Sequence, residues 1–132
     1  MALIGNFGKQ IKFSVSDKKI LTFEDFTETI SARWAKHNVQ NKLPRSEFLG
    51  SDLLNFTIKV TLDASFGVKP RKMRNKIKDC VRKGKVAHFV VGGHMVSKNK
   101  FKITQAQNEY KEILRDGKIA RIIMNLTFEE YV

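Results

Sequence analysis

The sequence predicts an α+β fold: a mostly antiparallel β barrel or sandwich with one flanking amphipathic helix. Apolar and polar residues alternate over 54–62 and again over 120–128, which is typical of strands with one buried face. The segment 70–83 instead places its apolar residues at helical spacing. Of the 132 residues, 42% are hydrophobic, which is enough for one core, so we expect a single domain spanning 1–132.

The elements before the helix follow from the same period of two. Residues 11–15 and 30–34 alternate over a shorter length and predict two further strands. Trp34 has the same parity as the apolar residues of its strand, so we expect its indole to face the core. The loop 63–67 joins a strand to the helix, and we expect Phe66 to pin this loop to the core.

The helix is bounded by residues that favour its two ends. Pro70 suits the first helical turn, because its ring fixes φ, and Gly84 suits the position after the last turn. Between them, four apolar residues recur on one face and predict the buried stripe: Met73, Ile77, Cys80 and Val81.

The residues after the helix predict further strands and a hairpin. Residues 86–91 are almost wholly apolar, as expected of a strand covered on both faces, and His88 inside it is expected to be a hydrogen-bonded structural histidine. The pair Asp116–Gly117 predicts a hairpin, since glycine supplies the positive φ of a primed turn. The apolar residues of the hairpin's first strand change parity, which a β-bulge near Thr104–Gln105 would explain.

The net charge of +12, from 25 Lys and Arg against 13 Asp and Glu, is concentrated in one segment. Residues 69–85 carry nine basic residues and one acidic residue. We favour a solvated face or a contact with an acidic protein over a nucleic-acid site, because this segment has no aromatic residue to stack on bases. No apolar run approaches the ~18 residues of a membrane span, so we expect no membrane contact.

No set of residues with catalytic, cofactor-binding or metal-binding spacing occurs in the sequence. The three histidines have no His, Cys or carboxylate at the offsets that metal sites use. The acidic pairs Glu24–Asp25 and Glu129–Glu130 are adjacent, so along a strand they point to opposite faces. The single cysteine, Cys80, excludes a disulfide-framed fold and suits a reducing compartment. We therefore expect no enzymatic activity.

An ordered series of short motifs spans the chain. They are Ile4–Gly8, Leu21–Phe26, Ser31–His37, Lys42–Gly50, Leu62–Pro70, Val91–Gly93 and Leu126–Val132. In this order and spacing, the series resembles the GpU family of phage tail proteins. The strongly basic helix departs from the family pattern, in which that helix is mixed in charge.

The resemblance implies a non-enzymatic structural part of a contractile tail, in a phage, a defective prophage or a tail-like bacteriocin. In the bacteriocin particle the similar protein sits at the baseplate and is called the ripcord. The fold would be related to the tail-tube fold. The implied place is the tube–baseplate junction, in a six-fold set that contacts the tube, hub, LysM-type and wedge proteins, in particles assembled in the host cytoplasm.

Five basic residues are the candidate contacts with such partners. Arg33 is expected to face away from the core, either outward or across a joint between subunits. Arg45 shares a strand parity with Glu47, as a surface pair or a pair across protomers. The other candidates lie on the outer face of the helix: Arg71, Arg74 and Lys78. Two alternatives to the tail-junction interpretation stay open, a basic nucleic-acid-binding module and a neck-proximal tail terminator.

Overall fold

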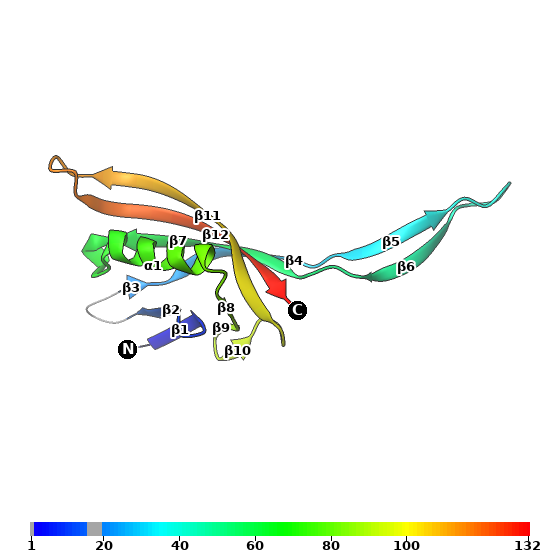
Figure 1. Cartoon of the computed structure of the whole chain (residues 1–132), viewed down its shortest axis with the longest axis horizontal. Helices are drawn as coiled ribbons and strands as arrows, with labels where there is room; N and C mark the ends of the chain where they lie inside the picture. The colour runs from blue at the N-terminus through cyan, green and yellow to red at the C-terminus, as the bar shows by residue number, and fades with distance from the viewer. Residues whose placement is uncertain (1, 16–19) are drawn as a thin grey trace.

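A computed structural model, which describes residues 2–15 and 20–132, confirms the α+β class and shows a body with a long projecting hairpin (Figure 1). Within the described residues, every strand pair is antiparallel, and the strands form two larger sheets and a separate two-stranded hairpin. Sheet A has the order β10–β9–β1–β2–β3, with strands at His94–Met95, Phe89–Val91, Ala2–Phe7, Ile11–Val15 and Ile20–Leu21.

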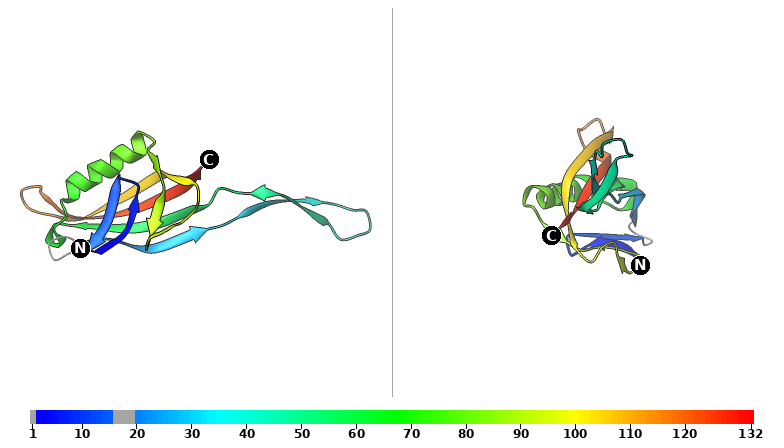
Figure 2. Two further views of the ribbon diagram at one scale, coloured as in Figure 1. Left: turned by 90° about the horizontal axis from the view of Figure 1, so that it is seen from below. Right: turned by 90° about the vertical axis from the view of Figure 1, so that its right-hand side faces the viewer.

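Sheet B is longer and curls like half a barrel. Its order is β4–β7–β12–β11–β8, with strands at Phe23–Thr29, Asn55–Asp63, Ile119–Tyr131, Lys100–Ile113 and Val86–Ala87. The strands of sheet A cross those of sheet B steeply (Figure 2). The helix α1 (Pro70–Arg82) lies beside sheet A, so that both cover the same inner face of sheet B.

The two strands expected from the clearest alternation form the centre of sheet B. β7 and β12 pair from Asn55↔Glu129 to Asp63↔Arg121 without a shift of register. Every second residue of both strands is buried on the inner face, where the partners are Phe56 and Phe128, Ile58 and Leu126, Val60 and Met124, and Leu62 and Ile122. The period of two therefore identified a real buried face.

The helix matches its sequence prediction at both ends and on its buried side. It begins at Pro70 and ends at Arg82, and Gly84 follows in a left-handed conformation with φ 62°. Ile77 and Cys80 are buried in the core, and Met73 and Val81 pack against it. The predicted stripe is therefore the face on which α1 docks.

The core between the sheets is dominated by phenylalanine rings. Phe56 and Phe128 stack with ring centroids 4.7 Å apart and an angle of 9° between their planes. Phe89 packs edge-on against Phe56 at 4.9 Å and against Phe128 at 5.1 Å, and Phe7 meets Phe128 at 5.3 Å. Both sheets thus contribute rings to one cluster, which ties the two layers together.

The predicted single strand at 86–91 is wrong. Val86–Ala87 pairs with β11 in sheet B, whereas Phe89–Val91 pairs with β1 in sheet A, so the chain changes sheets at His88. The run is apolar because it crosses from one layer of the core to the other. The carbonyl of His88 accepts a hydrogen bond from the Gly8 amide at 3.0 Å, but its buried Nδ1 has no partner in the described residues, contrary to expectation.

The turn at Asp116–Gly117 joins β11 to β12, as predicted, and the β-bulge lies where the parity change placed it, between Ile103 and Gln105. The turn type was predicted wrongly. Gly117 has φ 80°, but Asp116 does not share a positive φ, so the turn is not a primed one. The amide of Leu114 donates to Lys118 across the base of the loop at 2.8 Å.

The loop before the helix is held differently from the prediction. The Asp63 carboxylate accepts from the Ser65 amide at 2.9 Å and from its hydroxyl at 2.7 Å, and Gly67 turns the chain at φ 79°. Phe66 is 40% exposed and does not pin the loop, whereas Val68 is buried in the core. Because Gly67 redirects the chain just before it, Val68 enters the core in place of Phe66.

Candidate functional site

The feature most clearly left outside the core is the arm, residues 30–54. It contains β5 (Ala32–His37) and β6 (Arg45–Ser51), which pair only with each other in the described part of the chain. Its two strands continue β4 and β7 outward from the body, and the arm points away from both sheets (Figures 1 and 2). A two-stranded hairpin is marginally stable by itself in water, so a partner surface would complete this one.

The arm exposes large apolar side chains instead of burying them. Trp34 and Phe48 face each other across the two strands, packed edge-on at 5.1 Å, and remain 59% and 54% exposed. The predicted core position of Trp34 is therefore wrong, because its strand has no sheet above it. Other exposed apolar side chains of the arm are Ile30, Leu43, Leu49 and Leu53.

The side chains of the arm form one ion pair and one hydrogen-bonded His–Glu contact. Arg33 contacts Asp52 at 3.0 Å, and the Nε2 atom of His37 lies 2.6 Å from the Glu47 carboxylate. Arg45 pairs with His37 across the strands and shares a face with Glu47, but the partner of Glu47 is His37. The suggested Arg45–Glu47 pair is therefore not the one that forms.

A carboxylate fixes the base of the arm to the body. Glu130 Oε1 accepts a hydrogen bond from the backbone N–H of Leu54 at 2.7 Å, and the Glu130 N–H donates to the Leu54 carbonyl at 2.9 Å. Its Oε2 accepts from the Ser97 hydroxyl at 2.7 Å and from the Asn99 amide at 2.9 Å. These contacts hold the pKa of Glu130 below its ordinary value of 4.5, the Leu54 N–H having the largest effect.

We expect the hydrogen-bonded Glu130 carboxylate to make the free energy of unfolding depend on pH. A carboxyl with a lowered pKa in the folded state stabilises fully above its unfolded value, near 4.5, and the contribution is lost as pH falls through the folded value. Glu130→Gln should therefore lower the free energy of unfolding at about pH 7. Between about pH 7 and about pH 3, the free energy of unfolding of the variant should fall less than that of the wild type. Urea unfolding at both pH values measures this effect. Glu129→Gln, which alters only an ion pair with Lys102, is the control, and equal slopes for wild type and Glu130→Gln would contradict the prediction.

The candidate residues of the helix lie together on α1, apart from those of the arm. Arg71 is exposed, whereas Arg74 and Lys78 are half-buried. Arg74 donates from Nη1 to the Asn75 side chain at 2.9 Å, and its Nε is buried without a partner in the described residues. The structure thus separates the five sequence candidates into a helix group and an arm group, Arg33 and Arg45.

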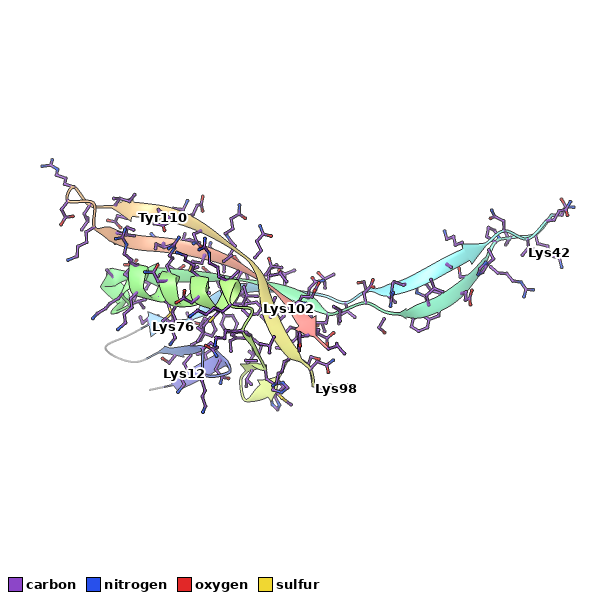
Figure 3. All side chains as sticks on the ribbon, viewed as in Figure 1. Lys12, Lys42, Lys76, Lys98, Lys102 and Tyr110 are labelled. Atoms are coloured by element: carbon purple, nitrogen blue, oxygen red, sulfur yellow. The ribbon has the colours of Figure 1, made fainter. Side chains whose placement is uncertain are left out.

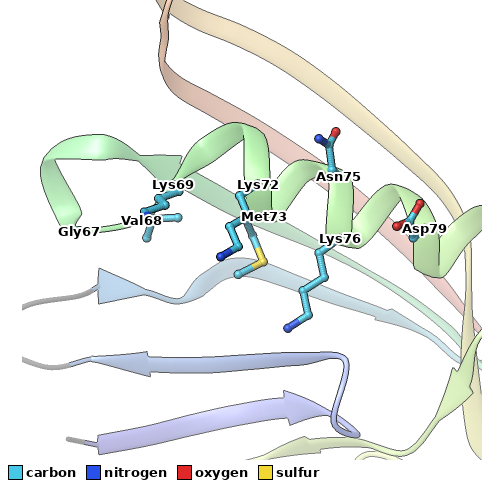
Figure 4. A pocket seen from close by; sticks show the side chains of 8 residues that line it. All are labelled: Gly67, Val68, Lys69, Lys72, Met73, Asn75, Lys76 and Asp79. Carbon is cyan, nitrogen blue, oxygen red and sulfur yellow. The ribbon is translucent and has the colours of Figure 1, made fainter.

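A second basic feature of α1 went unnoticed in the sequence. Lys69, Lys72 and Lys76 line an open cleft of about 720 Å³ together with Val68 and Met73. In Figure 4, Lys72, Met73 and Lys76 extend from α1 towards the strands of sheet A. The cleft places three lysines and Asp79 around apolar side chains. The sequence signal for it was the separation of the three lysines by three and four residues, which puts them on one face of the helix.

We expect this basic surface to bind nucleic acid weakly and without sequence preference. Attraction of that kind comes from counterion release, so it falls steeply with salt. Binding should be measurable at about 20 mM salt and lost at about 150 mM, where charges are screened beyond ~8 Å. Fluorescence anisotropy with a labelled duplex measures it. Submicromolar binding that persists at the higher salt would instead favour a nucleic-acid-binding module.

The rest of the described chain shows little that suggests chemistry. No group of three or more His, Cys, Asp or Glu side chains is placed to hold a metal ion among the residues that the structure describes. None of the helices described is long and apolar enough to cross a membrane.

Cys80 is buried on the helix stripe, where burial raises the pKa of its thiol. Side chains project from both sides of the arm as far as Lys42 near its tip (Figure 3).

Comparison with family models matches residues 9–132 to the model described as Phage P2 GpU. The match covers the arm, both sheets in large part, and the helix. Comparison with curated proteins gives no match.

Proposed function

Because the chain belongs to the Phage P2 GpU family and is therefore a phage tail protein, we propose that it is a non-enzymatic assembly component at the tube–baseplate junction. The observation that carries this proposal is the arm, which exposes Trp34 and Phe48 on a hairpin that has no core of its own. Exposed aromatic side chains on a projecting element are typical of protein–protein contacts. A tail part works through such contacts and needs no catalytic group.

In the particle, the protein would form a six-fold set around the tail axis and contact the tube, hub, LysM-type and wedge proteins. Head-to-tail contacts between identical copies close into a ring when the rotation between neighbours permits it. A projecting element such as the arm can make such a contact with the next copy. Assembly would take place in the host cytoplasm, and the finished protein would reside in a phage tail, a defective prophage tail or a tail-like bacteriocin, in the role called ripcord.

Mass spectrometry and antibody labelling of purified particles test this placement. Label at the baseplate end supports the junction role, label at the neck supports the tail terminator, and absence of the protein from particles contradicts both. A deletion complemented by the wild-type chain shows whether tails form without it.

The basic face of α1 would contact an acidic neighbour in the same particle. Arg71 and Lys78 lie off the buried stripe, so Arg71→Glu with Lys78→Glu should leave the thermal midpoint nearly unchanged. Placing like charges against each other at an interface costs several kcal/mol, so these chains should be lost from particles. Arg74 is left in place to protect the fold, because its Nε is buried and its Nη1 donates to the Asn75 side chain. Normal incorporation would show that the helix is only a solvated face.

A further inference from the structure

An open groove crosses the seam between the two sheets, on the side where β4 and β10 lie. It has a volume of about 430 Å³, and its polar lining residues are Glu28 and His94. Met95 at its edge is 55% exposed. The apolar lining comes from Phe23, Phe26, Val91, Met95 and Val96. The body thus presents an apolar recess beside a carboxylate.

A local irregularity of β4 builds this groove. The register with β7 shifts between Glu24 and Thr27, and Asp25 takes a left-handed conformation at φ 56°. The extra residue turns Phe26 to the side of Phe23, with ring centroids 6.2 Å apart, and stacks it on Phe56 at 4.7 Å. Phe26 therefore extends the core cluster to the surface.

We propose that this groove receives the arm of a second copy of the chain. Trp34 and Phe48 would enter the apolar recess, and Lys36 would lie beside Glu28. Cross-strand pairing places Trp34 opposite Phe48 and Lys36 opposite Ser46, and residues two apart on a strand share a face, so the aromatic pair and the lysine lie on one side of the arm. The inference rests on the proposed function and adds the contact that joins neighbouring copies.

Charge complementarity selects the groove over the cleft on α1. Both acids of the arm are already engaged, Glu47 with His37 and Asp52 with Arg33, so the contact face keeps a free cation in Lys36, which has no ion pair among the described residues. Glu28 likewise has no ion pair in the described part of the chain. The α1 cleft is lined by Lys69, Lys72 and Lys76 against one carboxylate, Asp79, so its net positive charge would repel the arm. Among the residues that the structure describes, the lining of the groove contains Glu28 and no lysine or arginine.

The contact requires two molecules. The arm begins immediately after β4, a strand that lines the groove, and it points away from the body (Figure 1). It therefore cannot return to the groove of its own chain. Each copy has one arm and one groove on different surfaces, so the contact is head-to-tail and can repeat from copy to copy.

Charge exchange between the two surfaces tests the contact. Lys36→Glu and Glu28→Lys should each lower the association of copies at least about tenfold, because each sets like charges together. The double variant restores opposite charges and should recover most of the association. Lys12→Glu, an exposed charge change on sheet A, is the matched control. Failure of the double variant to recover, with both single variants folded, overturns the proposal.

Cross-linking measures that association and identifies the neighbour. Chains with Ser46→Cys on the arm and His94→Cys at the groove are treated with a short bismaleimide, both as concentrated pure protein and in purified particles. Native Cys80 is buried, and the wild-type chain controls for it. We expect a ladder of linked copies that weakens with Lys36→Glu and returns with the added Glu28→Lys.

The cross-linking results distinguish failure of the groove contact from failure of the tail function. Links from the arm to a different tail protein, or no links in particles that contain the chain, overturn the groove contact and leave the tail function intact. If the chain is absent from particles, the proposed function fails, and the concentrated protein alone decides the contact: a ladder supports it, and no ladder overturns it.

Discussion

Replacing Phe56 with alanine is expected to lower the free energy of unfolding by about 3–5 kcal/mol, a large part of the ~5–15 kcal/mol that holds a typical domain together. Phe56 is fully buried between two parallel rings, Phe26 and Phe128, each with its centroid 4.7 Å away. Phe89 and Phe101 meet it edge-on at 4.9 Å. Truncation removes all of these contacts and leaves a cavity where both sheets meet.

Urea unfolding followed by circular dichroism measures this loss. Phe66→Ala is the matched control, because Phe66 is a phenylalanine outside the core and its removal should change stability by less than about 1 kcal/mol. Equal losses at Phe56 and Phe66 would show that the stacked cluster does not hold the sheets together.

Replacing both Trp34 and Phe48 with alanine is expected to leave stability nearly unchanged but to abolish incorporation into tails. The pair is exposed and outside the core, so the free energy of unfolding should change by less than about 1 kcal/mol. In the particle, aromatic anchors of this kind are worth about 2 kcal/mol or more each, or roughly 30-fold in affinity. Incorporation into tails should therefore be lost while the isolated chain stays folded.

Quantitative mass spectrometry of purified particles, with thermal melts of the isolated variant, checks both halves of this expectation. Tyr110→Ala with Ile113→Ala removes exposed apolar side chains from the body and serves as the control. Normal incorporation of the arm variant would show that the aromatic pair does not contact the particle. A large fall in thermal midpoint would return Trp34 to the core role that its sequence parity suggested.

Much of the body could be predicted from the sequence, because each of these segments shows its buried face in its own pattern of apolar residues. Alternation in 54–62 and 120–128 identified two strands whose buried faces meet each other, and helical spacing with Pro70 identified α1. The parity change near Thr104 placed the bulge, since a two-residue period can be broken only by an added residue.

The arm could not be predicted, for a physical reason. Alternation shows that a strand has two chemically different faces, but not that another layer covers the apolar one. The strand holding Trp34 pairs with β6, where Phe48 is the large apolar residue opposite it, flanked by Ser46 and Gly50. A buried strand needs a partner strand with several apolar residues on the same face. β6 offers only Phe48 on that face, and this shortage was the signal available in the sequence. The sheet change at His88 was hidden because a run that crosses a core is as apolar as one embedded in it.

The attachment of the arm also determines how the protein bears mechanical load. Both arm strands continue into sheet B, one as β4 and the other as β7, which pairs with β12 along its whole length from Asn55 to Asp63. Hydrogen bonds of an antiparallel ladder run perpendicular to the strands, so tension along the arm shears many of them together instead of opening them one by one. A pull on the arm is therefore spread over the central β7–β12 ladder of sheet B, so the arm can transmit tension directly to the body.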